Sequence, residues 1–499
     1  MSTTTVSNKI SYSEAENQGA LVAVKAHLIA AFLVFLLMML AGATLRAAQG
    51  NMAPIGADVF YQFMTVHGAG MIGIAAIAGM AVLWYFLRQY VPLSTKIFWI
   101  NFGIFLTGVV IILGSVFLGK YGGAWTFLYP LPGISMGAWS TGAAAAFLLG
   151  LLIIGTGFLI LLLDFGRAIL SSYGSFGRAL GLPQLFGKEP LNPYHPATVV
   201  AGTMVLIVDF IGIAAGAVVL VMMLVNLYNP EFKPDPLLVK NLIYFFGHVI
   251  INVAIYSAVV AIYELLPRYT GRPYKTSKVF YAAWFAIVFM VMSVYPHHLY
   301  MDFPMPKWAM IGAQILSYGS GLPVMVVTGY GALMLVYRSG IRWNTSAKLL
   351  MLSIFGWAAG GIPAVVDSMV SFNRVLHNTM WVPGHFHFYL LLGVLPMIFG
   401  FTFYLLNGAN GAQEEKPPLT ERLGFYSFVG GALLFVGGFL ASGASGIPRR
   451  WAVHLEEWVP YAQWSTLGAV LVIVGVLLFT LRVLTVLPKA PDPALAPAH

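Results

Sequence analysis

The sequence contains no cysteine among its 499 residues. This absence excludes disulfide bonds, cysteine-ligated zinc, iron–sulfur clusters, covalently attached c-type heme and any copper centre that needs thiolate ligands. If the protein takes part in electron transfer, another polypeptide has to deliver the electrons.

Charged residues are also scarce. They make up 9% of the chain, whereas 59% of residues are hydrophobic and the mean hydropathy is +0.83. Soluble globular proteins carry about 25% charged residues, so this composition excludes a soluble protein. We expect a polytopic membrane protein, for which a domain count based on length does not apply.

Long apolar runs indicate how the chain crosses the membrane. Runs of about 20 residues can span the hydrocarbon core as helices, and their continuous rather than alternating hydrophobicity argues against a β-barrel. We expect an all-α protein with a cytoplasmic N-terminal segment (1–23), one transmembrane domain (24–487) and a C-terminal tail (488–499). There is no convincing internal repeat of the transporter type. The twelve expected spans lie near 24–47, 63–87, 97–119, 138–165, 198–226, 240–265, 279–300, 308–337, 347–370, 379–406, 425–443 and 463–487.

The basic residues predict the orientation. With a cytoplasmic N-terminus, most of the 26 lysines and arginines fall on the inner side, notably in "PRYTGRPYKTSK", which fits the positive-inside rule. The net charge of +9 is therefore a topology signal and does not indicate nucleic-acid binding. The basic residues expected outside are Arg46, Lys120, Lys233, Lys240, Lys307, Arg374, Arg449 and Arg450.

Six of the eleven histidines fall at one predicted depth. We expect ordinary interfacial or terminal roles for His27, His195, His454 and His499. The six lie within two or three helical turns of the predicted outer face, on four different spans. One such histidine would most simply be a hydrogen-bonded core residue, but six together suggest metal ligands. They are His67, His248, His297, His298, His385 and His387.

The stretch "HNTMWVPGHFHFYL" (377–390) suggests how these ligands are divided. Residues two apart on a helix point about 200° apart, so His385 and His387 suit two metals on opposite flanks. Gly384 would let a bulky macrocycle approach. His67 can complete the site of His387. His248, His297 and His298 remain as a three-histidine set, and Pro296 predicts a distorted backbone beside the last two.

Together, "HNTMWVPGHFH", "PHHLYMD", "GHVIIN", the early histidine of the second span and "GIPRRW" resemble the catalytic subunit I of the heme–copper oxygen reductase superfamily. The resemblance covers about residues 60–451 and is strongest to the B family. It implies that His67 and His387 ligate a low-spin heme of b type, and that His385 ligates a high-spin heme of unspecified type. It also implies that His248, His297 and His298 bind copper. Imidazole suits several metals, so copper comes from the resemblance alone.

The same resemblance implies a propionate region. Arg449 and Arg450 correspond to the family's propionate-binding pair, and guanidinium groups suit carboxylates. The alternative for two loop arginines is simple solvation. Asn373 and His377 are further candidates for this region.

Residue 252 departs from the family pattern. Oxygen reductases of this branch carry a tyrosine four positions after the first copper histidine, cross-linked to it, and iron-containing nitric oxide reductases carry a glutamate. Asn252 supplies neither an electron nor an acidic proton. Oxygen cleavage needs four electrons, whereas coupling two nitric oxide molecules to nitrous oxide needs two. We therefore expect nitric oxide reduction, as in the copper-containing nitric oxide reductases.

Tyr256 is the main objection, because it lies two turns after His248 and could replace the missing phenol. The alternatives for Tyr256 are a packing aromatic or a member of a proton path. Oxygen reduction by a cytochrome c oxidase therefore stays open. A heme-free proton-coupled transporter is the rival from another class.

Polar residues of the sixth and eighth spans resemble in kind the single proton channel of B-family enzymes. Hydroxyl groups in membrane helices often only bond their own backbone, so this signal is weak. Asp209 is the most deeply placed acid, and we expect its carboxyl group to be uncharged. A role in proton relay and a structural hydrogen bond are equally open for this residue. The candidate path residues are Ser257, Tyr263, Glu264, Ser317, Ser320, Thr328, Tyr330 and Asp209.

The expected protein is a quinol- or cytochrome-fed respiratory reductase subunit in a bacterial or archaeal plasma membrane, with its heme layer near the periplasm. Its substrate would be a small gas. Because the chain lacks cysteine, we expect a separate electron-entry partner: a small membrane-anchored subunit with a copper or c-heme domain, or cytochrome c.

Overall fold

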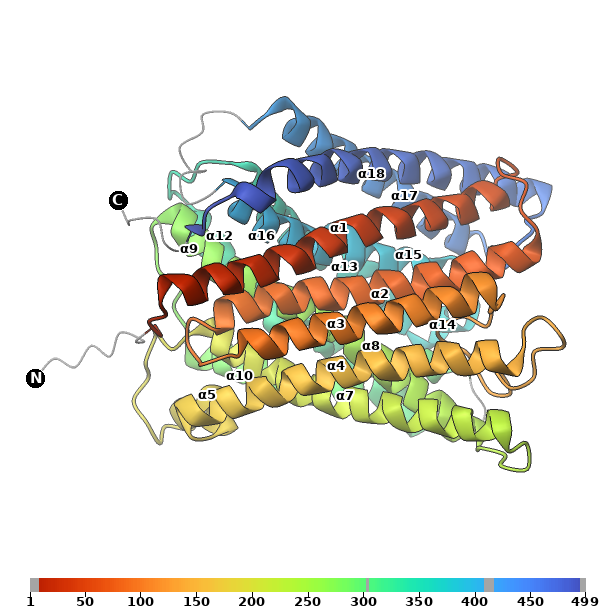
Figure 1. The fold of residues 1–499 in the computed structure, drawn as a ribbon, viewed down its shortest axis with the longest axis horizontal. Helices are drawn as coiled ribbons and strands as arrows, with labels where there is room; N and C mark the ends of the chain where they lie inside the picture. The colour runs from red at the N-terminus through yellow and green to blue at the C-terminus, as the bar shows by residue number, and fades with distance from the viewer. Residues whose placement is uncertain (1–8, 302–304, 408–416, 494–499) are drawn as a thin grey trace, which may run out of the picture.

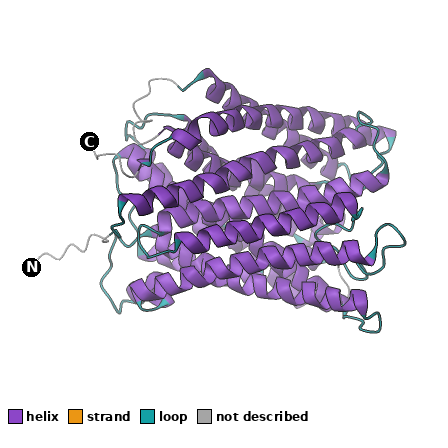
Figure 2. Cartoon of the chain, in the orientation of Figure 1, coloured by secondary structure: helices purple, strands orange, loops and turns teal. Residues whose placement is uncertain are grey.

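The chain folds into a bundle of long helices (Figure 1). The computed structural model describes residues 9–301, 305–407 and 417–493. Within these ranges there is no strand, and only one isolated bridge joins Thr379 to Pro448 (Figure 2). Twelve helical segments there are long and apolar enough to cross a membrane. The predicted all-α, multi-pass architecture is confirmed.

Several spans are single helices. They are α1 (Glu14–Gln49), α2 (Ala57–Leu87), α4 (Thr141–Tyr173), α7 (Ala197–Tyr228), α13 (Thr345–Ser368), α17 (Leu419–Ala444) and α18 (Val459–Val486). The number and order of all twelve helical spans agree with the twelve apolar runs, and several of the helices, such as α1, extend beyond the predicted bounds.

The other spans change helix type or break along their length, and three of the four spans that bear the clustered histidines are among them. Pro296 lies in a 3₁₀ turn, which confirms the distortion expected beside His297 and His298. The interrupted spans are α3 (Thr95–Leu113) with η1 (Gly114–Leu118), α8 (Pro236–Ala258) with α9 (Val260–Thr270), α10 (Lys278–Ser293) with η2 (Tyr295–Leu299), α11 (Lys307–Ser320) with α12 (Leu322–Val336), and α15 (Trp381–Phe388) with η3 (Tyr389–Val394) and α16 (Leu395–Asn407).

Short helices complete the connections between the spans. They are α5 (Phe176–Ala179), α6 (Leu182–Leu185), α14 (Val370–Leu376), η5 (Glu456–Trp458) and η6 (Leu487–Lys489).

Both predicted terminal segments are partly ordered against the bundle. Helix α1 begins at Glu14 rather than at residue 24, because Ser13 and Glu16 form a capping box that satisfies free backbone N–H groups. At the other terminus, Asp492 accepts a 2.8 Å hydrogen bond from the Tyr85 hydroxyl. Contacts with the bundle therefore continue on the terminal side of both expected boundaries, 23 and 488. His499 and the rest of 494–499 lie outside the described residues.

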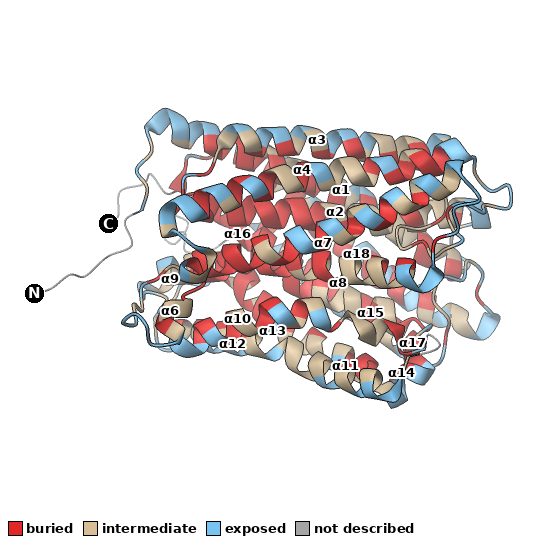
Figure 3. Ribbon diagram, turned by 90° about the horizontal axis from the view of Figure 1, so that it is seen from below, coloured by how far each residue is buried: buried red, intermediate tan, exposed pale blue. Residues whose placement is uncertain are grey.

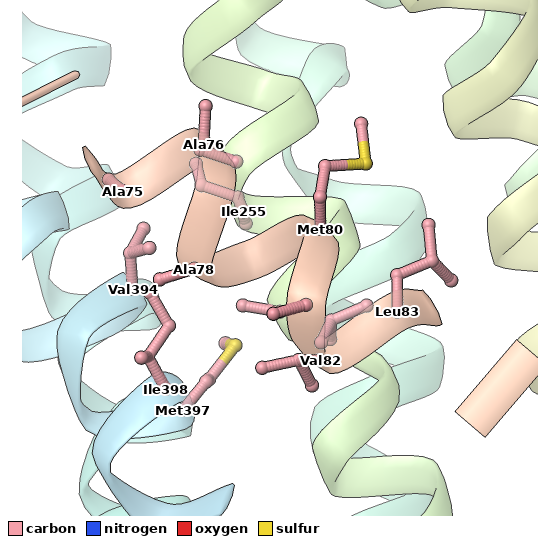
Figure 4. Close-up of a cluster of buried hydrophobic side chains, with 14 of the residues drawn as sticks. Ala75, Ala76, Ala78, Met80, Val82, Leu83, Ile255, Val394, Met397 and Ile398 are labelled. Carbon is pink, nitrogen blue, oxygen red and sulfur yellow. The ribbon is translucent and has the colours of Figure 1, made fainter. Parts of the chain in front are cut away.

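The centre of the bundle is formed by α2, α8 and the α15–α16 span, the most deeply buried of the twelve (Figure 3). Small and branched side chains of α2, such as Ala78 and Val82, pack beside Ile255 of α8 and Ile398 of α16 (Figure 4). Gly79 allows the close approach, since an added Cβ would lie 3.1 Å from the Ala254 carbonyl oxygen. These three spans also carry four of the six clustered histidines.

The chain closes on itself around this centre. Sequential pairs α1–α2, α3–α4, α7–α8 and α17–α18 pack together, and α18 returns to lie against α1. Both termini are at one end of the bundle (Figure 1). Because successive spans alternate in direction, the histidines near the start of α2, α8 and α15 and near the end of the α10–η2 span gather at the opposite end, called here the histidine end.

Candidate functional site

All six clustered histidines line one internal cavity at the histidine end. The cavity has a volume of about 810 Å³ and is lined mostly by apolar side chains. That volume lies in the upper part of the roughly 300–1,000 Å³ range of ligand and cofactor sites. The predicted convergence of the histidines from four spans is therefore observed in the geometry.

His67 and His387 face each other across one side of the cavity. Their rings are almost parallel, with an interplanar angle of 12° and 6.1 Å between centroids. The Nδ1 atom of His67 lies 2.7 Å from the carbonyl oxygen of Met38, and that of His387 lies 2.6 Å from the carbonyl oxygen of Pro383. Metal-binding histidines commonly use one ring nitrogen in this way, which leaves Nε2 free for the metal.

This spacing fits a single metal atom between the two rings. Two metal–nitrogen bonds of about 2 Å, plus about 1 Å from each nitrogen to its ring centre, place the centroids about 6 Å apart. Gly42 makes room for His67, since an added Cβ would lie 2.5 Å from the imidazole Cε1. On the other side, Phe435 and Phe439 each pack with ring centroids 5.2 Å from that of His387.

His248, His297 and His298 form a second group. One ligand nitrogen from each lies within 4.8 Å of the other two, which makes the triad a candidate metal site. The Nδ1 atom of His297 lies 3.0 Å from the Ser317 hydroxyl, so its Nε2 remains available. The α8 helix supplies His248 and the 3₁₀ turn η2 supplies the other two. Three neutral imidazoles are a donor set that suits copper, and also iron or zinc.

His385 lies between the two groups. It follows the start of α15 on the flank opposite His387, as the 200° argument predicted. Its Nε2 lies 3.9 Å from an Asp367 oxygen, its Nδ1 has no hydrogen-bond partner among the described residues, and its ring centroid is 6.2 Å from that of Tyr389. A partly buried imidazole on the wall of a large cavity fits a ligand to a bulky group.

Gly384 does not face the cavity as we expected. An added Cβ would lie 3.0 Å from Leu440 and 3.2 Å from Phe439, so Gly384 permits close packing of α15 against α17. The prediction that it makes space for a macrocycle is wrong, because the helix turns this position toward its neighbour.

Asn252 and Tyr256 both line the cavity. The Asn252 amide donates a 2.8 Å hydrogen bond to the carbonyl oxygen of His248, one turn earlier on the same helix. Tyr256 packs edge-on against Trp284 and Trp357, with centroids 5.4 and 6.0 Å away. No phenol occupies the position one turn after His248, but the phenol two turns after it belongs to the same wall.

The predicted propionate region is only partly at the cavity wall. Arg449 and Arg450 line the cavity, and the Arg449 backbone N–H is held by the carbonyl oxygen of Asn378 at 2.9 Å. Asn373 lies behind the wall, where its amide donates to the backbone oxygen of Asp367 at 2.7 Å. His377 is likewise absent from the residues that line the cavity.

Burial and the neighbouring Arg450 charge lower the pKa of Arg449, whereas the nearby Tyr244 and the Asp367 carboxylate act in the opposite direction. Both of these neighbours line the cavity. A buried cation beside a cavity suits a carboxylate-bearing ligand.

The predicted proton-path residues separate into two groups. Ser317 and Ser320 line the cavity, and Tyr263 and Thr328 share a buried 2.6 Å hydrogen bond nearer the terminal end. Tyr330 does not fit an internal path, because its side chain is 66% exposed on the surface of the bundle. We correct that prediction, since the apolar sequence of α12 did not reveal which face is buried.

The remaining path candidates have other surroundings. Glu264 accepts hydrogen bonds from Tyr90 at 2.9 Å and Thr198 at 2.5 Å, and Ser257 lies 3.7 Å from the Met80 sulfur. Asp209 is fully buried, and neither carboxylate oxygen has a hydrogen-bond partner among the described residues. The structural hydrogen bond that we considered for Asp209 is therefore not observed.

Of the four histidines expected to have ordinary roles, the three that the structure describes are not among the residues that line the cavity. His27 stacks on Phe98 with centroids 3.9 Å apart, and His195 lies 2.8 Å from the Ala179 carbonyl oxygen. His454 is buried near Trp458, and burial lowers its pKa to about 4.

Four wall residues were missed by the sequence analysis. Arg46 is buried over the Phe439 ring at 4.5 Å and was assigned only a topological role, although a charge in the last turn of an apolar helix is a signal. Asp367 precedes the histidine-rich segment 377–387, and Tyr389 follows it closely. Tyr244 precedes His248 by one turn, so helical periodicity could have placed it on the same face.

The fold and the cavity define a multi-pass membrane protein with two histidine-based metal sites at one end. Comparison with known proteins gives the family. Residues 22–471 match the model of the family described as "Cytochrome C and Quinol oxidase polypeptide I". The chain therefore belongs to this family, the subunit I of heme–copper oxidases, and is an oxidoreductase whose family carries hemes and copper.

Individual relatives support this membership. The chain is 24% identical over 479 residues to cytochrome c oxidase subunit 1 of Synechocystis sp., which covers 92% of this chain and 82% of the relative. It is 25% identical over 288 residues to the corresponding subunit of Thermus thermophilus, covering 53% of this chain and 51% of the relative. A solved heme–copper terminal oxidase dimer has the same fold, with a TM-score of 0.77, 21% identity, and coverage of 96% of this chain and 85% of that one.

Proposed function

We propose that this chain is the catalytic subunit of a respiratory terminal reductase. In this proposal His67 and His387 hold a low-spin heme, His385 holds a high-spin heme, and His248, His297 and His298 hold copper. The observation that carries it is the convergence of all six imidazoles on one cavity, with Nδ1 of both rings of the facing pair held by backbone carbonyl oxygens. When bound, these groups would supply the one-electron redox chemistry that the amino acids lack.

The side chains of the chain then have definable tasks. Backbone carbonyl groups fix the ring planes of His67 and His387, and Ser317 fixes that of His297. Arg449 and Arg450 provide the positive charge for propionates. Ser317 and Ser320 can pass protons toward the cavity, and Tyr256 extends the polar wall toward the Tyr263–Thr328 pair.

Oxygen is the substrate that we place first. Synechocystis, Thermus and Cereibacter relatives are all cytochrome c oxidase subunits, and Tyr256 places a phenol on the wall of the cavity. Reduction of one oxygen molecule to two water molecules consumes four electrons and four protons. A donor subunit would have to supply the electrons, because the chain has no cysteine for a thiolate copper centre.

Nitric oxide is the second candidate, and Asn252 favours it. Because residue 252 is an asparagine, the position one turn after His248 offers no phenol for a fourth electron. Its amide group instead donates a hydrogen bond to the His248 backbone. Coupling two nitric oxide molecules to nitrous oxide and water consumes two electrons and two protons, which needs no such phenol.

Steady-state turnover of the purified complex with each gas separates the two candidates. If oxygen is the substrate, we expect rapid oxygen consumption. If nitric oxide is the substrate, we expect nitrous oxide formation with negligible oxygen consumption. Pyridine hemochrome analysis and copper quantification test the cofactors. A purified protein without a Soret band would contain no heme. This result would contradict both candidates and would favour the heme-free transporter.

We further propose that the partner is a membrane-anchored copper or c-heme subunit, or cytochrome c, and that the histidine end faces the periplasm of a prokaryotic plasma membrane. The distribution of lysine and arginine supports the orientation. Mass spectrometry of the purified complex tests the partner, and a fully active single polypeptide would contradict it.

A further inference from the structure

One side chain of the cavity wall, that of Trp125, touches the helix backbone beside a histidine of each candidate metal site. Trp125 belongs to the loop between η1 and α4 and lines the cavity. A Cβ atom added at Gly68, next to His67 on α2, would lie 2.7 Å from the indole Cδ1. A Cβ atom added at Gly247, next to His248 on α8, would lie 3.3 Å from the indole Cη2. Glycine at both positions therefore leaves room for the ring.

Opposite edges of the indole make these two contacts. Cδ1 belongs to the five-membered ring and Cη2 to the far side of the six-membered ring, so the indole fills the gap between α2 and α8 at this level. Deeper in the bundle the same two helices approach each other directly, since a Cβ atom added at Gly79 would lie 3.1 Å from the Ala254 carbonyl oxygen. The helices thus diverge toward the histidine end, where the indole separates them.

The backbone on both sides of Trp125 is fixed to the histidine end. The Ala124 N–H donates a 2.9 Å hydrogen bond to the Thr65 hydroxyl group on α2. The Thr126 hydroxyl group accepts a 3.1 Å hydrogen bond from the Arg450 guanidinium. Ala124 has a φ of 62°, in the left-handed region that residues with a Cβ atom seldom adopt. Such a conformation persists only where the surrounding contacts enforce it, so the loop holds the indole in one place.

We propose that Trp125 is a positioning residue that sets the separation of α2 and α8 beside His67 and His248. The inference rests on the proposed function, because it concerns how the chain places one ligand of the low-spin heme and one ligand of copper. Close-packed interiors transmit a displacement of this kind, since side chains there have few alternative positions. A shorter or absent ring should therefore move whichever helix it no longer touches.

Two substitutions of Trp125 in the purified holoenzyme separate the two contacts. Trp125→Phe keeps a ring near Gly68 but is too short to reach Gly247, and Trp125→Ala removes both contacts. We expect Trp125→Phe to lose copper to a chelator faster than the parent, with an unchanged electron paramagnetic resonance (EPR) spectrum of the oxidised low-spin heme. We expect Trp125→Ala to lose copper about tenfold faster, the lower end of the range for residues that support metal ligands. Its EPR spectrum should also change, because that spectrum depends on the angle between the two imidazole planes, which is 12° here.

Gly247→Ala provides the decisive comparison, because its effect should change sign with the residue at position 125. In the parent the added methyl group presses on the indole ring, so we expect faster loss of copper. In the Trp125→Phe background the same methyl group fills part of the space that the six-membered ring leaves, so we expect slower loss than in Trp125→Phe alone. A general loss of stability would act in the same direction in both backgrounds.

Trp139→Ala is the matched control. Trp139 lies in the same loop, packs against Tyr121 with ring centroids 5.1 Å apart and is not among the residues that line the cavity. Copper retention and the EPR spectrum of this variant should equal those of the parent. Copper is measured by elemental analysis over time in the chelator, and circular dichroism checks that each variant is folded.

The outcomes distinguish this inference from the proposed function. If the parent contains neither heme nor copper, the proposed function fails, and this inference fails with it. If the parent is loaded but Gly247→Ala acts in the same direction in both backgrounds, or Trp125→Ala matches Trp139→Ala, the positioning role of Trp125 is refuted while the proposed function stands. Should Trp125→Ala not fold, the comparison of Gly247→Ala in the two backgrounds decides alone.

Discussion

The two histidine sites of this protein are built differently. In the facing pair, each Nδ1 is close to a backbone carbonyl oxygen, and the rings sit on α2 and α15 in regular helix. In the triad, two of the three histidines lie in a 3₁₀ turn, and the His297 ring is hydrogen-bonded to the Ser317 hydroxyl. Backbone atoms thus orient the pair, whereas side chains orient much of the triad. We expect the pair to be preorganised and the triad to depend more on its metal.

Replacing one histidine ligand in each site should produce the largest effects, and each replacement should affect only the cofactor of its own site. We expect His387→Ala to lose essentially all low-spin heme but keep copper, and His298→Ala to lose copper but keep the low-spin heme. Heme spectra and copper analysis of the purified proteins provide the measurement. His27→Gln is the matched control, since it alters a buried histidine stacked on Phe98, away from the cavity. Loss of both cofactors in both variants would show that the sites are not independent.

Replacing Asn252 by tyrosine tests what the triad lacks. We expect Asn252→Tyr not to restore a fourth-electron phenol by itself, because the larger ring must displace an amide bonded to the His248 backbone. Oxygen turnover should not rise above the parent's, and the protein should lose about 1–3 kcal/mol of stability, the typical packing cost of a small-to-large change. A large gain in oxygen consumption over the Asn252→Phe control would contradict this.

Removing Ser317 tests the side-chain support of the triad. Outer-shell partners of metal-binding histidines typically contribute about 10- to 100-fold in affinity. We therefore expect Ser317→Ala to weaken copper retention by about tenfold, while the low-spin heme spectrum is unchanged. Ser320→Ala provides the control, because this hydroxyl group bonds only the Ser317 backbone oxygen at 3.1 Å. Equal copper retention in all three proteins would contradict the role of Ser317.

The smallest effect concerns acid stability and depends on His454, in the loop before α18. The buried, neutral His454 has a pKa lowered to about 4, below the ordinary value of about 6.5. In the unfolded chain this imidazole takes up a proton first as the pH falls, so stability declines between about pH 6.5 and about pH 4. We expect His454→Gln to reduce this decline. Thermal unfolding followed by circular dichroism measures it, and an unchanged pH dependence would refute the assignment.

Much of this architecture could be predicted from local sequence. The twelve spans follow from continuous hydrophobicity, and the 200° separation of His385 and His387 follows from helix geometry alone. The distortion at Pro296 follows from the missing N–H and fixed backbone angle of proline.

Other features depend on contacts between distant segments and could not be predicted. The carbonyl oxygen that holds His67 belongs to Met38, on the neighbouring helix. Gly384 faces α17 and Tyr330 faces outward, and both directions depend on how the helices rotate within the bundle. In a membrane helix both faces are apolar, so hydrophobic periodicity gives little guidance to rotation.

The short helix α15 has a consequence for how the two sites can evolve. Because His385 and His387 are separated by only Phe386, covalent geometry sets the spacing between their sites, and bundle flexing changes it little. Inserting one residue there would turn the second imidazole by about 100° and detach it from its partner. Connections at the terminal end are free of this constraint, so length variation among related chains should concentrate there.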